Sequence, residues 1–428
     1  MNNRNYRELF NGIEETIQLA DGREICPINF DNAATTPPLK KVDEFIYDNI
    51  LMYGSVGRGG HKSSYCTRAY EISREEVLRF FGLDLNEDYE VIYVKNTTEG
   101  INLLANNLCE NRQTKILATR MEHHANDLPW RYLAQPYYCE INLKDGRLHL
   151  EQVEERLKKA QGTIKYVTVT AASNVTGYIN PIHEIARIVH QYGAKLIVDG
   201  AQLVAHRAVD IKGKCQEEAI DFLVFSGHKM YAPFGSGVII ATKEILEQCP
   251  PFLKGGGAVS FVLDNDVYYK STPYKEEAGT PNFLGVMSII AAMTVLKEVG
   301  FEAIQFHEDL LRNRLISGLR QISKVTLYGD PLEQNRVGVV PFNIQGIPAD
   351  TVGQLLQDKR GIATRTGCFC AQPYVMRLLG IDNEARYAYL MNPKLEKPGM
   401  VRASFGLYNT EEEVDEFLNV IEWIVNKD

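Results

Sequence analysis

The chain has 428 residues, of which 45% are hydrophobic, so it can hold one large domain and a smaller one around a sizeable core. Its 46 basic and 55 acidic side chains give a net charge of −9, which argues against a general affinity for nucleic acid or for an anionic membrane. No stretch approaches the roughly 18 uninterrupted apolar residues of a membrane span, and residues 1–5 lack the apolar core of a signal peptide. We therefore expect a cytoplasmic protein with no nucleic-acid or membrane partner, whose partners are small molecules or proteins.

The first predicted strand, residues 91–94, leads into Asn96, Thr97 and Thr98 and then into a helix-like segment from residue 101. Hydroxyl groups and backbone N–H groups at a helix N-terminus can bind phosphate. The same residues could equally serve only as helix caps.

The next strand, residues 116–119, is followed by the adjacent His123 and His124. A histidine here could stack on a flat heteroaromatic ring or move protons. Two neighbouring histidines could also suggest a metal, but neighbours on a strand or loop point apart and no carboxylate–histidine spacing supports a site. We expect no bound metal.

A strand at residues 166–170, a helix at 182–192 and a strand at 195–199 follow one another, and further strands are predicted at 221–225 and 237–241. Strand, helix and strand at this spacing need a crossover connection, so the strands should be parallel in a sheet covered by helices on both faces. The fold class is therefore α/β. Ligands of such sheets bind beyond the carboxyl ends of the strands.

Two residues at those strand ends are candidates for chemistry. Lys229 follows the strand 221–225 in a polar, glycine-containing turn, where partial desolvation would let its amine form a Schiff base with an aldehyde. Asp199 ends the preceding strand, where its carboxylate could pair with a pyridinium nitrogen. The alternatives are a surface lysine and a helix-capping aspartate.

The last quarter of the chain has a different pattern. A strand is predicted at residues 337–344 and a helix at 350–359, and Thr410 with Glu413 forms a capping box before a final amphipathic helix. We predict a large domain over residues 26–299. Residues 300–428, together with 1–25, are predicted to form a smaller α+β domain that carries Cys370.

Five segments, at residues 122–126, 173–177, 199–202, 225–229 and 277–282, resemble motifs of the class V aminotransferase family, specifically its group II cysteine desulfurases and selenocysteine lyases. The resemblance is collinear from about residue 30 to residue 409, and residues 31–37 resemble the segment through which the family admits substrate. It implies a fold-type-I homodimer with active sites at the subunit interface and pyridoxal 5'-phosphate as the cofactor. It also implies a large domain with a mostly parallel seven-stranded sheet and a smaller α+β C-terminal domain.

The resemblance also implies roles for individual residues. Lys229 would carry the cofactor as an aldimine, Asp199 would pair with its pyridinium nitrogen, and His123 would stack on its ring. The phosphate would be bound by Thr98, Ser226 and His228, and by Thr280 of the other subunit. Gln202 would contact the phenolic oxygen of the cofactor, and Thr97 would also contact the cofactor. Asn174, Arg365 and Arg402 would lie around the substrate, with Asn174 also beside the cofactor.

Residues 365–373 resemble the desulfurase loop, with Cys370 at the position of the nucleophile. Two features depart from the family. Cys368 and Phe369 stand where the family carries two histidines, and the connection over residues 374–401 is longer than expected. Cys368 could resolve or relay a persulfide, or it could pack as a small apolar residue. We expect the connection to be a solvated loop rather than a docking element.

Because of these features, we expect a pyridoxal-phosphate-dependent cysteine desulfurase that converts L-cysteine to L-alanine and forms a persulfide on Cys370. A sulfur-acceptor protein could be a further partner. Three alternatives stay open: a selenocysteine lyase, another class V enzyme that does not use Cys370 (an epimerase, β-lyase or transaminase), and a non-catalytic protein on the same fold.

Overall fold

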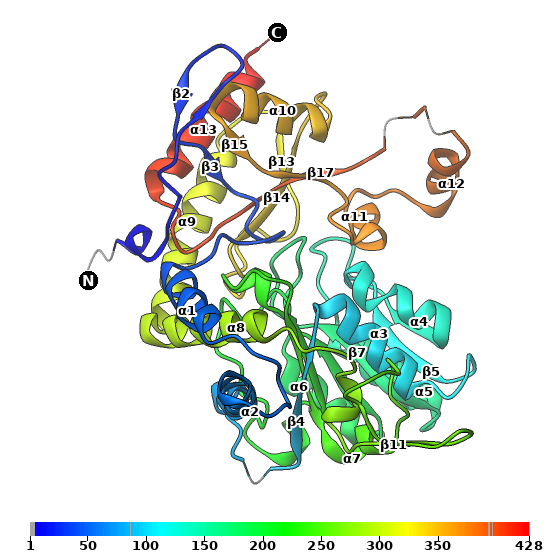
Figure 1. Cartoon of the computed structure of the whole chain (residues 1–428). Helices are drawn as coiled ribbons and strands as arrows, with labels where there is room; N and C mark the ends of the chain where they lie inside the picture. Colours follow the sequence, from blue (N-terminus) through cyan, green and yellow to red (C-terminus); the bar gives the residue numbers. More distant parts are fainter. Residues whose placement is uncertain (1–4, 86, 393, 396, 428) are drawn as a thin grey trace.

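A seven-stranded sheet forms the centre of the lower part of the molecule (Figure 1), in the strand order β4-β10-β9-β8-β7-β5-β6. The computed structural model describes residues 5–85, 87–392, 394–395 and 397–427. The strands are β4 (Tyr89–Val94), β5 (Lys115–Thr119), β6 (Gln135–Cys139), β7 (Ile164–Thr170), β8 (Lys195–Asp199), β9 (Phe222–Ser226) and β10 (Gly237–Thr242). Only β10 runs antiparallel to its neighbours β4 and β9. The predicted α/β class and the mostly parallel seven-stranded sheet are confirmed.

The central strands are apolar on both faces, as expected for strands covered by helices on each side. In β9, Leu223 and Phe225 pack into one core, and Phe222 and Val224 pack into the core on the opposite face. The helices of this part are α1 (Lys40–Leu51), α2 (His61–Phe80), α3 (Thr97–Leu108), α4 (Leu128–Leu133), α5 (Leu150–Ala160), α6 (Ile182–Gln191), α7 (Lys243–Glu247) and α8 (Phe283–Val299). We call the sheet and these helices the large lobe.

A four-stranded sheet, in the order β13-β14-β17-β16, forms the centre of the upper part, the small lobe (Figure 1). Its strands are β13 (Val325–Leu327), β14 (Val339–Ile344), β16 (Arg365–Gly367) and β17 (Met400–Ser404), and its helices are α9 (Phe301–Leu319), α10 (Ala349–Arg360) and α13 (Glu411–Val425). The predicted capping box of Thr410 and Glu413 is present at the start of α13.

The N-terminal segment joins the small lobe. It contains the short strands β1 (Ile17–Gln18), β2 (Glu24–Ile25) and β3 (Ile28–Asn29), and β3 pairs in parallel with β15 (Ile362–Ala363). Ile28 and Phe30, which follow the predicted boundary at residue 26, pack into the core of the small lobe. The chain passes between the lobes again at Gly300, where α8 and α9 meet at an angle of 80°. The division at residue 300 stays a prediction.

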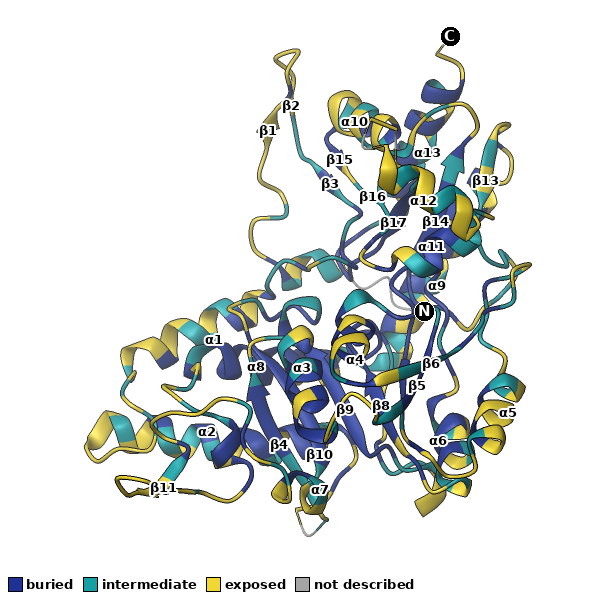
Figure 2. Cartoon of the chain, turned by 90° about the vertical axis from the view of Figure 1, so that its right-hand side faces the viewer, coloured by how far each residue is buried: buried dark blue, intermediate teal, exposed yellow. Residues whose placement is uncertain are grey.

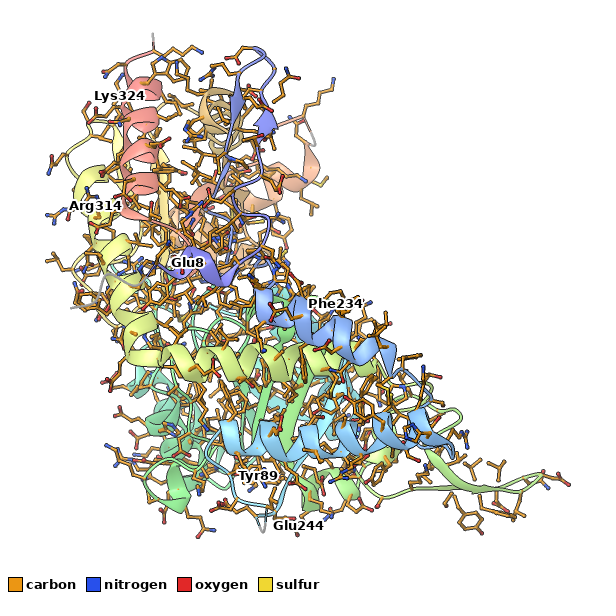
Figure 3. The ribbon with its side chains drawn as sticks, turned by 60° about the vertical axis from the view of Figure 1, so that its left-hand side comes forward. Glu8, Tyr89, Phe234, Glu244, Arg314 and Lys324 are labelled. Carbon is orange, nitrogen blue, oxygen red and sulfur yellow. The ribbon has the colours of Figure 1, made fainter. Side chains whose placement is uncertain are left out.

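No single described helix is long and apolar enough to cross a membrane, and the pair that reaches this length together, α8 and α9, is the one bent at Gly300. Outside the two lobes, β11 (Val259–Val262) and β12 (Val267–Tyr269) form a hairpin that extends from the large lobe (Figure 3).

The long connection after Cys370 is not a bare loop. It begins with α11 (Gln372–Leu378) and contains α12 (Asn383–Met391), so the loop expectation is wrong for residues 374–378 and 383–391. Asp382 caps α12 by accepting a hydrogen bond from the N–H of Ala385, a start signal that the sequence carries. The helix has no buried residue (Figure 2) and extends away from both lobes (Figure 1).

Candidate active site

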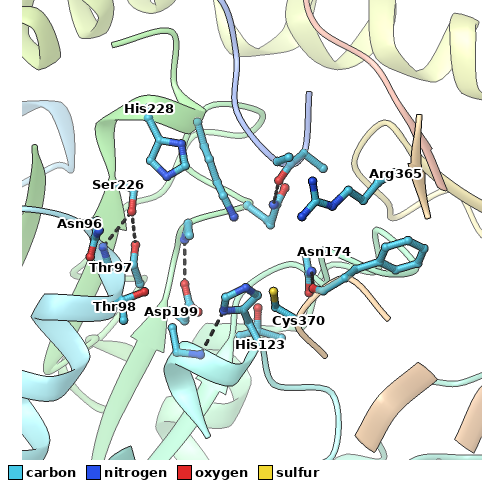
Figure 4. Close-up of a pocket in the computed structure, with 18 of the residues that line it drawn as sticks. Asn96, Thr97, Thr98, His123, Asn174, Asp199, Ser226, His228, Arg365 and Cys370 are labelled. Atoms are coloured by element: carbon cyan, nitrogen blue, oxygen red, sulfur yellow. Dashed lines mark hydrogen bonds between the residues drawn. The ribbon is translucent and has the colours of Figure 1, made fainter. Parts of the chain in front are cut away.

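A cavity of about 210 Å³ lies beyond the carboxyl ends of β7, β8 and β9, where the small lobe faces the large lobe (Figure 4). It brings together every predicted site residue of this chain except Thr280: Thr97, Thr98, His123, Asn174, Asp199, Gln202, Ser226, His228, Lys229, Arg365, Cys370 and Arg402. Lys229 comes from the large lobe and Cys370 from the segment after β16, so both lobes contribute to the cavity.

Lys229 lies in a tight turn, the 3₁₀ helix η4 (Gly227–Lys229), directly after β9. A Cβ atom at Gly227 would lie 2.8 Å from the side chain of Ile289, so this position has no room for a larger residue. The carbonyl of His228 accepts hydrogen bonds from the backbone N–H and the hydroxyl of Thr36, both at 3.0 Å. The segment before α1 therefore holds the lysine turn in place.

The surroundings of the Lys229 amine favour its neutral form. Burial lowers its pKa to about 8, the Arg402 guanidinium adds to the decrease, and the carboxylate of Asp199 opposes it. An amine that is partly neutral near pH 7–8 can attack an aldehyde and can also take up a proton.

Asp199 and His123 face the same cavity (Figure 4). Asp199 is 3% exposed and accepts a hydrogen bond from the N–H of Ala201 at 3.0 Å; burial raises its pKa, and that N–H and Lys229 lower it. The Nδ1 atom of His123 accepts a hydrogen bond from the N–H of Ala125 at 3.1 Å. Burial, followed by the charge of Lys229, lowers the pKa of His123 to about 3, so its ring is neutral.

Glu122, the first residue of the segment 122–126, for which the sequence predicted no role, is buried. Its carboxyl accepts hydrogen bonds from the Thr119 hydroxyl at 2.5 Å and from Nδ2 of Asn126 at 2.6 Å. Burial raises the pKa of Glu122 to about 8. Its hydrogen bonds link β5 to the short helix η2 (His124–Asn126), which fixes the segment that carries His123.

The N-terminus of α3 closes one end of the cavity. The helix begins at Thr97, four residues earlier than the predicted helix-like segment, because the Asn96 side chain caps it by accepting a hydrogen bond from the N–H of Glu99. The Ser226 hydroxyl accepts a hydrogen bond from the N–H of Thr97 at 2.8 Å and lies 2.7 Å from the Thr97 hydroxyl. Thr98 is exposed at this end. Hydroxyl groups at a helix N-terminus form a site suited to an anion.

Cys370 lies in a turn of unusual backbone conformation, which we call the thiol turn (residues 368–371). The N–H of Ala371 donates to the carbonyl of Cys368 at 2.8 Å, and the two central residues have positive φ angles, 50° for Phe369 and 53° for Cys370. Positive φ at both central positions is typical of a type I′ turn, which usually contains glycine or asparagine. For residues with larger side chains it costs roughly 1–3 kcal/mol each.

Contacts with the large lobe hold the thiol turn. Nδ2 of Asn174 donates to the carbonyl of Phe369 at 2.7 Å, and the backbone N–H of His124 donates to the carbonyl of Cys370 at 2.6 Å. The Phe369 ring is 5% exposed and packs in an apolar cluster between the lobes. The phenylalanine that stands in place of a histidine therefore anchors the turn.

Two arginines of the small lobe face the cavity. Arg402 is buried and donates to the carbonyl of Asn174 at 2.9 Å and to the carboxylate of Asp31 at 2.7 Å. Its buried Nε atom has no hydrogen-bond partner among the described residues. Arg365 is exposed, and its nearest contact with Asp31 is 3.9 Å. The pair provides positive charge suited to the carboxylate of a small substrate.

The predicted contacts Gln202 and Thr280 lie in different parts of the structure. The Gln202 side chain lines the cavity, and its amide donates to the carbonyl of Ala33 at 2.7 Å. Thr280 lies in a different groove, which also contains Arg58, Thr67 and Arg74. Its implied contact from a second subunit stays a prediction.

A family model described as Aminotransferase class-V matches residues 28–417 of the chain. A probable cysteine desulfurase of Halalkalibacterium halodurans is 37% identical over 399 residues, which make up 91% of this chain and 90% of that protein. A cysteine desulfurase of Dickeya dadantii is 36% identical over 395 residues, or 90% and 89% of the two chains. Both similarities extend over the two lobes.

Solved structures show the same similarity. The apo cysteine desulfurase from Thermococcus onnurineus NA1 matches with a TM-score of 0.82 and 34% sequence identity, over 93% of this chain and 94% of that one. The cysteine desulfurase CsdA from Escherichia coli matches with a TM-score of 0.78 and 26% identity, over the same shares of the two chains. The arrangement of the two lobes is thus shared with these proteins.

Proposed function

Because the chain belongs to the aminotransferase class-V family, we propose that it is a pyridoxal-phosphate-dependent cysteine desulfurase, which converts L-cysteine to L-alanine and leaves a persulfide on Cys370. The observation that carries the proposal is that Lys229 and Cys370, from different lobes, line one cavity. A lysine at this position would serve many reactions of an amino acid. A thiol facing the same space adds an acceptor for sulfur.

Pyridoxal phosphate fits the donor groups of the cavity. The Lys229 amine matches its aldehyde, and the Asp199 carboxylate, whose pKa is raised by burial, matches a protonated ring nitrogen. The neutral His123 ring matches a flat heteroaromatic face, and the N-terminus of α3 matches a phosphate. When bound, pyridoxal phosphate supplies an electron sink for charge that develops at the substrate's α carbon.

Other side chains of this chain bind the substrate and transfer the proton. Arg402 and Arg365 bind the substrate carboxylate, and the contacts of Arg402 with Asn174 and Asp31 fix its position. Nζ of Lys229 takes the proton from the α carbon and returns one to complete alanine, which suits an amine with a pKa near 8.

Cys370 accepts the sulfur. Its thiolate attacks the substrate's sulfur atom, a bond forms between the two sulfur atoms, and the bond between carbon and sulfur breaks with its electron pair left on carbon. Cysteine and the Cys370 thiol thus become alanine and a Cys370 persulfide, with no external oxidant or reductant.

The proposal is tested with purified, yellow holoenzyme, L-cysteine and a reductant. We expect wild type and Cys215→Ala, which changes an exposed cysteine outside the cavity, to form alanine and sulfide in equal amounts. Cys370→Ala should keep its visible spectrum and lose at least about 100-fold of the rate. Pyruvate from both enzymes, or equal rates of alanine formation, would assign the protein another class V chemistry.

The same proposal includes a homodimer in the cytoplasm. A role for Thr280 at a cavity requires a second subunit, because it lies outside the cavity of its own chain. The β11–β12 hairpin beside this groove exposes Phe261, Val262 and Tyr268 at 62%, 57% and 56%, an apolar surface suited to a subunit contact. All eight cysteines are free thiols, as is usual in a reducing compartment. Measuring the molar mass of the protein in solution by light scattering tests the dimer.

A further inference from the structure

We propose that Cys368 is a resolving thiol: it attacks the Cys370 persulfide, releases sulfide and leaves a Cys368–Cys370 disulfide across the thiol turn. The inference rests on the proposed desulfurase function and adds a second sulfur-handling residue to it. The product of one turnover in the absence of reductant would then be free sulfide and an oxidised turn, rather than a stored persulfide.

The thiol turn brings the two cysteines together. Cys368 and Cys370 are its first and third residues, and the hydrogen bond from Ala371 to Cys368 closes the backbone around them. Consecutive Cα atoms are about 3.8 Å apart, so the bent backbone keeps these two Cα atoms within the roughly 4.4–6.8 Å that disulfides span. A disulfide between them therefore needs no movement of the lobes.

Cys368 lies two residues before Cys370 in the thiol turn and is less exposed. Burial raises the pKa of the Cys368 thiol, the neighbouring Cys370 thiol raises it further, and the backbone N–H groups of Cys368 and Cys370 lower it. Cys368 is partly buried against the apolar cluster that also contains Phe369, whereas Cys370 is exposed. Cys370 thus meets the substrate, and Cys368 lies behind it.

The contacts of the thiol turn with the large lobe fix its conformation for this step. The carbonyls of Phe369 and Cys370 are held by Asn174 and by the N–H of His124, and the Phe369 ring is buried. The residue between the two cysteines therefore cannot swing into the solvent and carry the thiols apart. Cys370 is the only described cysteine that lines the cavity, and of the other seven only Cys368 belongs to the thiol turn.

The step balances without a further reactant. The Cys368 thiolate attacks Sγ of Cys370, a bond forms between these sulfur atoms, and the bond from Sγ to the outer sulfur breaks. The outer sulfur leaves as hydrosulfide and takes up the proton that Cys368 gave up. A persulfide and a thiol thus become a disulfide and hydrogen sulfide, and a dithiol or small thiol must reduce the disulfide before the next turnover.

The test is a single turnover. Holoenzyme freed of reductant receives one equivalent of L-cysteine under anaerobic conditions, and alanine, free sulfide and the tryptic peptide of residues 366–377 are measured. This peptide lies between Arg365 and Arg377 and contains both cysteines and no others. Wild type and the Cys215→Ala control should give alanine and sulfide in about equal amounts, and a peptide lighter by two hydrogen atoms.

Cys368→Ala and Cys368→Ser should form as much alanine, release at least about tenfold less sulfide, and keep one extra sulfur atom on Cys370 until reductant is added. If wild type also keeps the extra sulfur and releases no sulfide, the resolving role is wrong. If Cys370→Ala forms alanine at the wild-type rate, the proposed function itself fails, and this result is independent of Cys368.

A second measurement needs no turnover. Incubation of the holoenzyme with glutathione disulfide should close the Cys368–Cys370 disulfide in wild type. The same treatment of Cys368→Ser should leave a mixed disulfide with glutathione on Cys370. A glutathione adduct on Cys370 in wild type, with Cys368 still reduced, would contradict the geometry on which the inference depends.

Discussion

The two sides of the cavity are built in different ways. On the lysine side, each polar residue lies at or just after the end of a strand of the large sheet, and its position is set mainly by that strand and one local turn, with an added contact from Thr36 to the turn. On the thiol side, Cys370 lies in a turn with two positive φ angles that depends on Asn174 and His124 of the other lobe. The first arrangement is local and the second is made between lobes, so each can be altered while the other persists.

The largest effect is expected on the lysine side. Lys229→Ala should lower the rate of alanine formation by about 10³-fold or more, because the chain loses both the amine that attacks the aldehyde and the proton carrier. The visible absorbance of the purified protein should be lost as well. Lys165→Ala, which changes an exposed lysine of β7, is the control and should match wild type. An unchanged spectrum in Lys229→Ala would exclude its assigned role.

An intermediate effect, on stability, is expected at Glu122, next to His123 in the sequence. The pKa of Glu122 is raised to about 8 in the folded protein from an ordinary value near 4.5, so the folded state binds a proton that the unfolded chain has lost. Its contribution is therefore present below pH 4.5 and is lost as the pH rises toward 8, by about 3 kcal/mol between pH 5 and pH 8.

Glu122→Gln removes this loss, because glutamine has no proton to give up. The free energy of unfolding of the variant, measured with urea, should rise relative to wild type as the pH increases over this interval. Glu110→Gln, which changes an exposed glutamate, is the matched control. A constant difference between Glu122→Gln and wild type from pH 5 to pH 8 would show that the buried carboxyl does not titrate there.

The smallest effect is expected for one contact of the thiol turn. Asn174→Ala removes the hydrogen bond to the carbonyl of Phe369, which should cost about 1 kcal/mol of stability and lower the rate of alanine formation about tenfold. The visible spectrum should persist. The rate at which iodoacetamide alkylates Cys370 should change, because the thiol loses its fixed position.

Asn180→Ala is the matched control for this variant, since it also removes a hydrogen bond from a buried asparagine to a carbonyl, that of Thr170, away from the thiol turn. If both variants alkylate at the wild-type rate, the turn does not depend on its contact with the large lobe.

The sequence predicts more of the structure on the lysine side of the cavity than on the thiol side. All six predicted strands of the large sheet are present within two residues of their predicted ends, and the residues after them line the cavity. Apolar runs with polar residues at their ends are local signals. The edge strand β6 has no such signal, because it contains Pro136 and polar positions, and it was missed.

The conformation of the thiol turn could not be read from the sequence. Phe369 and Cys370 have no local preference for positive φ, and the contacts that impose it come from Asn174 and His124, about 195 and 246 residues earlier in the chain. The role of Phe369 as a buried anchor was missed for the same reason. By contrast, α12 has a local signal in the sequence, the cap at Asp382.

The pairing of β3 with β15 also sets the order in which the molecule can be completed during synthesis. Arg360 donates a hydrogen bond to the carbonyl of Cys26, 334 residues earlier. The small lobe therefore cannot be completed until the last part of the chain has been synthesised. Domains tend to fold as their residues leave the ribosome. A nascent chain can therefore form the lysine side of the cavity before Cys370 has been translated, and the residues that the small lobe contributes, Cys370 and then Arg402, are the last parts of the site to arrive.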